Sequence, residues 1–119
     1  MQLTTAQLFA NPCDEEEDNM ALIFCETVEQ ETLLLSRFPD DEDVALSLGD
    51  DAYAWQDLKI TFGPERLLIE LSASDAADFN GIDHLEIRHA TPAGDLAEVE
   101  ATLRIILDGT GTYISELDN

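Results

Sequence analysis

The sequence predicts an α+β fold, in which a mainly antiparallel sheet of about six strands carries a C-terminal helix packed on one face. Two observations predict the sheet. Apolar and polar residues alternate over several short segments, which is the period of a half-buried strand. Most connections between these segments are too short for the crossover that parallel strands need. A third observation predicts the helix, because residues 95–107 place apolar side chains at helical spacing.

The strands of the first half are separated by acidic clusters. Residues 20–25 form a short apolar run, which predicts a strand buried on both faces, and residues 32–35 predict a second strand. The four residues between Glu26 and Glu31 are short enough for an antiparallel hairpin. After Pro39, residues 40–43 are expected to form a solvated loop. Residues 44–48 then alternate with period two, and Tyr53 and Trp55 fall on one face of an extended stretch.

The second half contains a hairpin and two helices. Residues 58–71 alternate on both sides of Gly63-Pro64, and residues 82–89 predict another half-buried strand. We expect Ser74 to cap a short helix at 75–79. Asp95 is expected to cap the long helix, whose apolar stripe is Leu96, Val99, Leu103, Ile106 and Leu107. A short strand through Tyr113 and Ile114 is expected to follow.

The length of 119 residues and the absence of a Pro/Gly/Ser-rich linker predict a single acidic α+β domain over 1–119. Apolar residues make up 45% of the chain, which is enough for a core. The first twelve residues lack the pattern of a secretory signal, and two cysteines cannot make a disulfide framework. We therefore expect a cytoplasmic protein with reduced thiols.

No residue pattern predicts catalysis. A zinc site would need Cys13, Cys25, His84 and His89 to converge, although the two histidines, five apart on a strand, point to opposite faces. The simpler interpretation is buried thiols and surface imidazoles. The sequence thus predicts no enzyme, no catalytic residue, no metal and no cofactor. Tyr53 and Trp55 fit either an interface or buried sheet packing.

Charge is the strongest functional signal. The chain has 27 acidic and five basic residues, a formal net charge of −22. This charge repels nucleic acid and anionic membranes, so we expect no direct binding to either. It favours a basic protein partner. Residues 14–51 hold the densest clusters, so the predicted partner-binding residues are Asp14, Glu15, Glu16, Glu17, Asp18, Asp40, Asp41, Glu42, Asp43, Asp50 and Asp51.

Two inhibitor functions fit such a surface. An immunity protein would block a cognate toxin by covering the Lys and Arg side chains that hold the toxin's substrate. A nucleic-acid mimic of the anti-restriction or anti-CRISPR type would instead present carboxylates at phosphate-like spacing to a DNA- or RNA-binding protein. The acidic density falls after Asp51, which favours the immunity protein, since a mimic needs charge along its whole length.

The order of elements adds a resemblance that spans roughly residues 20–107. It is carried by Ala21-Leu22-Ile23-Phe24-Cys25-Glu26, Leu33-Leu34-Leu35-Ser36-Arg37, Asp51-Ala52-Tyr53, the hairpin 58–71, Ala76-Ala77, Leu85-Glu86-Ile87 and the helix 96–107. In this pattern of apolar and acidic positions the chain resembles the immunity protein 10 family of bacterial polymorphic toxin systems. The resemblance implies a non-enzymatic, intracellular protein that binds and neutralises a toxin.

Overall fold

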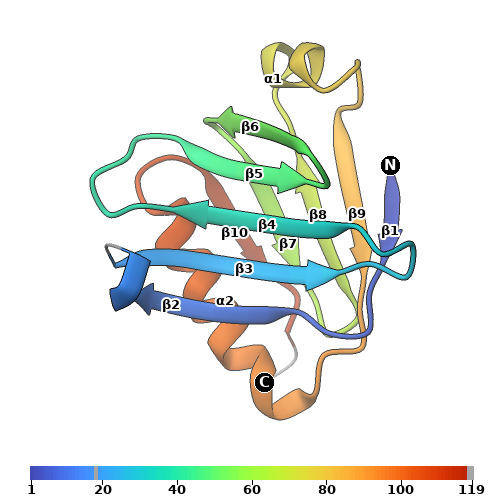
Figure 1. The fold of residues 1–119 in the computed structure, drawn as a ribbon, viewed down its shortest axis with the longest axis vertical. Coiled ribbons are helices and arrows are strands. Elements are labelled where there is room, and N and C mark those ends of the chain that lie inside the picture. Colours follow the sequence, from blue (N-terminus) through green and yellow to red (C-terminus); the bar gives the residue numbers. More distant parts are fainter. Residues whose placement is uncertain (18, 118–119) are drawn as a thin grey trace.

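The computed structural model describes residues 1–17 and 19–117, which form ten strands in two five-stranded sheets, two α-helices and one 3-10 helix (Figure 1). The first sheet has the order β1-β9-β8-β7-β10, and the second has the order β2-β3-β4-β5-β6. The strands of the first sheet are β1 (Gln2–Thr4), β7 (Lys59–Phe62), β8 (Arg66–Glu70), β9 (His84–Arg88) and β10 (Thr112–Ser115). Those of the second are β2 (Phe9–Asp14), β3 (Met20–Glu26), β4 (Thr32–Arg37), β5 (Val44–Leu48) and β6 (Asp51–Trp55).

The second sheet is a meander in which every strand is antiparallel to the next. The first sheet is built differently, because only β7, β8 and β9 follow one another as antiparallel neighbours. Its two edges are parallel pairs: β1 joins β9, and β10 joins β7. The terminal segments of the chain thus close both edges of the first sheet.

One hydrophobic core lies between the sheets. Its largest fully buried side chains include Ile23, Leu35 and Leu46 of the second sheet and Ile60 and Ile69 of the first. Alternation places these residues inside, since successive side chains of a strand point to opposite faces.

Helix α2 (Ala93–Leu107) closes the core on one side by packing against β2, β3 and β10 (Figure 1). Its predicted stripe is confirmed, because Val99, Leu103, Ile106 and Leu107 are buried and Leu96 is partly buried. The prediction for its start is wrong: Pro92 is the N-cap, without a side-chain hydrogen bond, and Asp95 lies in the first turn.

Helix α1 (Ala73–Asp78) and the residue after it close the opposite side. Phe79 makes edge-on contacts with Tyr53 and Trp55, at centroid distances of 5.0 and 5.3 Å, and Trp55 is only 2% exposed. Of the two interpretations of these aromatics, the structure thus shows core packing for Trp55. The expected cap is also displaced, because Ser72, not Ser74, accepts the hydrogen bond from the amide of Asp75.

The α+β class, the mainly antiparallel pairing and the packed helix are confirmed. The expectation of one sheet with about six strands is wrong, since the strands divide into two sheets. The expected strand buried on both faces is also wrong. In β3, Ala21, Ile23 and Cys25 are buried, whereas Leu22 is half-buried and Phe24 is 41% exposed.

The second sheet therefore has an outer face, on which two cross-strand rows can be followed through the register. We define the outer face by the row Phe9, Phe24, Leu34, Ser47 and Ala52 and the row Asn11, Leu22, Ser36, Ala45 and Ala54. Figure 1 views the molecule from this side, and no described element lies in front of the sheet.

Candidate partner-binding surface

The meander brings most of the predicted binding residues to one end of the second sheet. The β2–β3 and β4–β5 connections both lie there, because alternate connections of a meander share an end. Glu15 and Glu16, in the 3-10 helix of residues 15–17, are exposed, and so are Asp40, Asp41, Glu42 and Asp43. Asp18 lies outside the described residues, and so do the side chains of Asp14 and Glu17. We call Glu15, Glu16 and residues 40–43 the first acidic end.

Asp50 and Asp51 are not part of this group. They lie in the β5–β6 turn and at the start of β6, at the other end of the same sheet. The β3–β4 connection shares that end and contributes Glu26, Glu29 and Glu31. We call these five residues the second acidic end. The predicted binding residues thus occupy both ends of one sheet, not one continuous patch.

The loop of residues 40–43 is held by contacts from three segments, through Thr110, Gln56 and Arg37. The hydroxyl of Thr110 donates to the carbonyl oxygen of Glu42 at 2.8 Å. The amide of Gln56 donates to Oδ1 of Asp43 at 2.6 Å. These contacts use one carboxylate only, that of Asp43, and all four carboxylates of the loop belong to exposed residues.

Arg37 is the single basic residue within 14–51, and its charge is directed inward. Its guanidinium donates to the carbonyl oxygens of Ile106, at 3.1 Å, and of Asp108, both at the C-terminal end of α2. Nε also donates to the carbonyl oxygen of Asp41 at 3.0 Å. The cation therefore holds the acidic loop against the negative end of a helix dipole.

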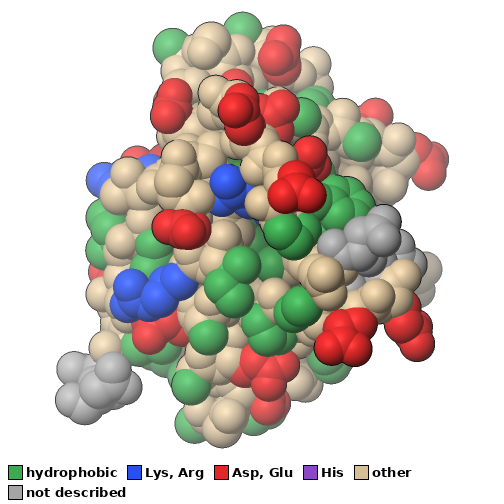
Figure 2. Space-filling model, turned by 90° about the vertical axis from the view of Figure 1, so that its left-hand side faces the viewer, with side chains coloured by type: hydrophobic (Ala, Val, Ile, Leu, Met, Phe, Trp, Pro, Cys, Tyr) green, Lys and Arg blue, Asp and Glu red, His purple; other side chains and the backbone are tan. Residues whose placement is uncertain are grey.

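Figure 2 views the molecule from the first acidic end. Carboxylates are spread around an apolar area, and Lys and Arg side chains lie among them. A hollow at this end is lined by Arg37, Phe38, Pro39, Ile105 and Asp108, together with Asn19 and Ala21. The surface is thus acidic at its connections but not continuously anionic.

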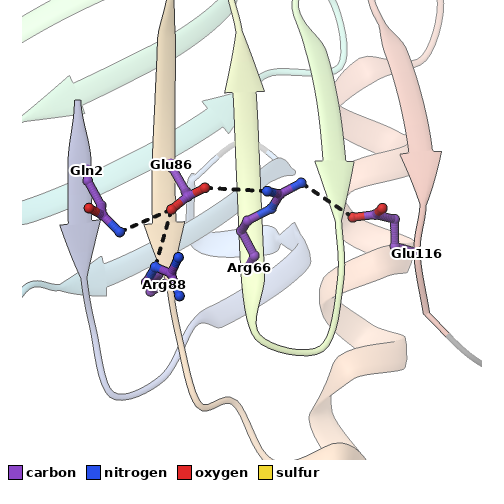
Figure 3. Close-up of polar contacts among 5 residues, drawn as sticks. All are labelled: Gln2, Arg66, Glu86, Arg88 and Glu116. Atoms are coloured by element: carbon purple, nitrogen blue, oxygen red, sulfur yellow. Dashed lines mark hydrogen bonds and ion pairs between the residues drawn. The ribbon is translucent and has the colours of Figure 1, made fainter.

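The outer side of the first sheet carries ion pairs instead (Figure 3). Arg66 lies 3.4 Å from Glu86 and 3.7 Å from Glu116, and Arg88 lies 3.3 Å from Glu86. Gln2 donates to the same carboxylate at 3.1 Å. Two of the five basic residues are therefore engaged there, on the sheet opposite the acidic ends.

The remaining two basic residues also lie away from the second sheet. Arg104 lies over the ring of Tyr113, 4.8 Å from its centroid, and 4.0 Å from Glu100. Desolvation and the hydrogen bond to Glu100 raise the pKa of Tyr113, which keeps this hydroxyl a donor. Lys59 is exposed on β7 of the first sheet. Four of the five basic residues thus lie on the first sheet or on α2, and only Arg37 belongs to the second sheet.

The four residues considered for zinc do not form a site. Within 1–17 and 19–117, no three His, Cys, Asp or Glu side chains are placed to hold a metal ion. Burial raises the pKa of Cys25, which is fully enclosed, so its thiol is protonated. Cys13 is exposed, which corrects the expectation that both thiols are buried.

The expectation of two surface imidazoles is wrong for His89. His84 is exposed and contacts Asp83 at 2.9 Å, but His89 is 5% exposed. Its Nε2 contacts the carbonyl oxygen of Gly63 at 3.1 Å, and Nδ1 contacts the hydroxyl of Thr91 at 2.8 Å. Both ring nitrogens are therefore occupied within the core, which gives this histidine a structural role.

Neither helix of the described chain is both long and apolar enough to cross a bilayer. Comparisons with protein-family models, with curated proteins and with solved structures found no match.

Proposed function

We propose that this protein is a cytoplasmic immunity protein, which binds a cognate bacterial toxin through an acidic surface and blocks it. The observation that carries the proposal is the placement of charge. In a chain of net charge −22, the exposed carboxylates of 40–43, 50 and 51 lie at the ends of one sheet. Three of the four arginines lie away from this sheet, and the fourth, Arg37, bonds carbonyl oxygens at the end of α2. The resemblance to the immunity protein 10 family supports the same function.

Such a surface suits the capture of a basic enzyme. Long-range attraction raises the association rate, to about 10⁸–10⁹ M⁻¹s⁻¹ at low salt for strongly complementary pairs. In contact, carboxylates accept charge-assisted hydrogen bonds from Lys and Arg. A toxin that holds substrate phosphates with these side chains presents the matching surface. Occupation of that surface would exclude the substrate, and the immunity protein would need no chemistry of its own.

The geometry favours this function over the nucleic-acid mimic. A mimic needs a track of negative charge, since duplex DNA carries one charge per ~1.7 Å of its axis. Here the two acidic ends are separated by strands of about five residues, roughly 17 Å of sheet. The outer face between them carries no charged side chain in its two central rows. The acidic ends therefore frame a surface instead of forming a track.

Binding to the product of the gene adjacent to this chain's own gene tests the proposal. We expect nanomolar binding, protection of cells that express that product, and an association rate that falls as NaCl rises from about 50 to about 500 mM. An affinity that is constant over this range would contradict the electrostatic mechanism. Absence of both binding and protection would contradict the immunity function.

A charge-neutral variant of the loop locates the effect. In Asp40→Asn/Asp41→Asn/Glu42→Gln, three carboxylates are removed whose neighbouring backbone contacts are retained. We expect the association rate at low salt to fall roughly tenfold, because steering depends on charge near the contact.

The matched control removes three exposed carboxylates away from the outer face of the second sheet, in Glu65→Gln/Asp78→Asn/Asp83→Asn. It has the same net charge as the loop variant. An equal loss of association rate in both variants would mean that only total charge matters.

A further inference from the structure

The outer face of the second sheet is uncharged and partly apolar in a chain that is otherwise dense in charge. None of its ten row positions carries a charge, and the nearest outward-facing charge of β3 is Glu26, at the end of that strand. Phe9 is 46% and Phe24 is 41% exposed, and their rings stack at 5.1 Å. Leu22 and Leu34 lie beside Phe24 and are half-buried. These side chains form an apolar surface that no described part of the chain covers.

The first sheet shows that this surface is not a general property of the fold. Its outward side carries a cross-strand ion pair between Arg66 and Glu86 and a second pair, within β9, between Arg88 and Glu86 (Figure 3). Antiparallel sheets that face water commonly have polar outward residues of this kind. The second sheet departs from that pattern, and exposed apolar patches with polar rims mark interaction sites.

We propose that the outer face is the docking surface for one partner, a protein whose contact surface is apolar at its centre and basic at its edges. This inference rests on the proposed function and names the contact that the toxin would make. Phe9, Phe24 and Leu34 supply the centre of the contact. The first and second acidic ends supply its rim, at either end of the strands.

Charge complementarity selects this partner. Both ends of the strands carry exposed carboxylates, so any macromolecule that covers the apolar rows also lies against negative charge at two opposite edges. A second copy of the chain would bring the same acidic ends together at a net charge of −22 each. Like charges juxtaposed in an interface cost several kcal/mol. A basic rim on the partner turns the same arrangement into attraction.

The outer face is too small to form a stable interface alone, so the contact must also include the acidic ends. Five strands spaced about 4.8 Å apart and about 17 Å long give a face of roughly 320 Å². A standard interface takes about 800 Å² from each partner. The apolar rows therefore supply less than half of it, and the acidic ends must supply much of the rest. This division matches the apolar centre and polar rim of stable interfaces.

Substitutions at Ala45 separate docking from electrostatic steering. Ala45 is exposed near the middle of the outer face. We expect Ala45→Asp and Ala45→Lys each to weaken binding of the adjacent gene's product by roughly 30-fold or more, because both place a charged side chain in a desolvated contact. Steering alone predicts opposite effects, since Asp would strengthen attraction to a basic partner and Lys would weaken it. That result would overturn the docking surface.

The same substitutions at Thr112 are the control. Thr112 is exposed on β10 of the first sheet, so Thr112→Asp and Thr112→Lys change the net charge equally without touching the outer face. We expect them to change affinity less than threefold at moderate salt. A second matched pair removes an apolar side chain. Leu34→Ser should weaken binding, and Ile114→Ser, which loses an isomeric side chain from β10, should not.

The outcomes distinguish failure of the immunity function from failure of the docking surface. If the wild type does not bind and does not protect, the immunity function and the docking surface both fail. If the wild type binds and the Ala45 variants, with unchanged melting temperatures, bind equally well, the docking surface alone fails. Sedimentation at about 500 mM NaCl tests self-association. If the wild type is a dimer there and Ala45→Lys is a monomer, the outer face binds a second copy, and the proposed partner is wrong.

Discussion

Replacement of Arg37 by methionine should destabilise the fold more than its surface position suggests. The guanidinium joins three segments: the loop of 40–43, the strand β4 and the C-terminal end of α2. Arg37→Met keeps an apolar stem and removes the donors. The last carbonyl oxygens of a helix have no hydrogen-bond donor within the helix. Without the guanidinium, the two acceptors at the end of α2 must therefore bond water.

The expected cost follows from the burial of each acceptor. A hydrogen bond from a charged donor contributes about 1.5–3 kcal/mol when it is protected from water. The bond to Ile106 is partly buried, whereas those to Asp41 and Asp108 are exposed and readily replaced by water. If the partly buried bond contributes its full energy and the two exposed bonds contribute little, the free energy of unfolding falls by about 2 kcal/mol. For a domain of this length, the melting temperature should fall by roughly 8 °C.

Thermal unfolding followed by circular dichroism measures this change, with Lys59→Met as the charge-matched control. Lys59 is exposed, and its loss changes the net charge by the same unit. Arg37→Lys keeps the charge but loses the planar fork, so it should recover only part of the stability. Equal melting temperatures for Arg37→Met and Lys59→Met, at both low and high salt, would refute the bridging role.

Two further predictions concern glycine and histidine positions. Gly111→Ala should lower the free energy of unfolding by about 2 kcal/mol or more, because a Cβ there would lie 2.6 Å from the carbonyl oxygen of Leu58. In Gly94→Ala, in the first turn of α2, the new Cβ meets no atom within 4 Å, so this variant should be more stable by about 0.5 kcal/mol. Urea unfolding measures both changes, and equal effects at the two positions would contradict this explanation. Burial lowers the pKa of His89, so the unfolded chain binds its proton first. The stability that His89 contributes is therefore present above pH ~6.5 and lost as pH falls below that value, and His89→Gln should reduce the stability difference between pH 7.5 and 5.5. A pH dependence that is identical in wild type and variant would show that His89 does not titrate during unfolding.

The local periodicity of apolar residues was sufficient to predict the elements that bury one apolar face. The hairpin of β7 and β8, the strand β9 and the stripe of α2 all follow from spacing alone. The first strands were missed for physical reasons. β1 has three residues and is defined by its parallel pairing with β9, some 84 residues away in the chain. β2 contains Pro12, which is typical of an edge strand and lies here at an irregularity of the register.

The candidate surface was predicted in part. The acidic connections are visible in the sequence, but their division between two ends depends on the order of the strands. The apolar run of β3 could not reveal its exposed side, because Leu22 and Phe24 are as apolar as the residues that face the core. The sequence also could not show that Arg37 points inward, because its acceptor on Ile106 lies 69 positions away in the chain.

The acidic ends limit the self-association that the apolar outer face would otherwise cause. An exposed apolar sheet face invites self-association, and proteins limit this hazard with charge near the exposed surface. A net charge of −22 keeps two copies apart, since each would bring its carboxylates against the other's. In the proposed complex, the same charge would attract a partner of opposite sign to the outer face. High acidity thus allows the chain to keep Phe9 and Phe24 exposed, and in the proposed complex the basic partner would cover them.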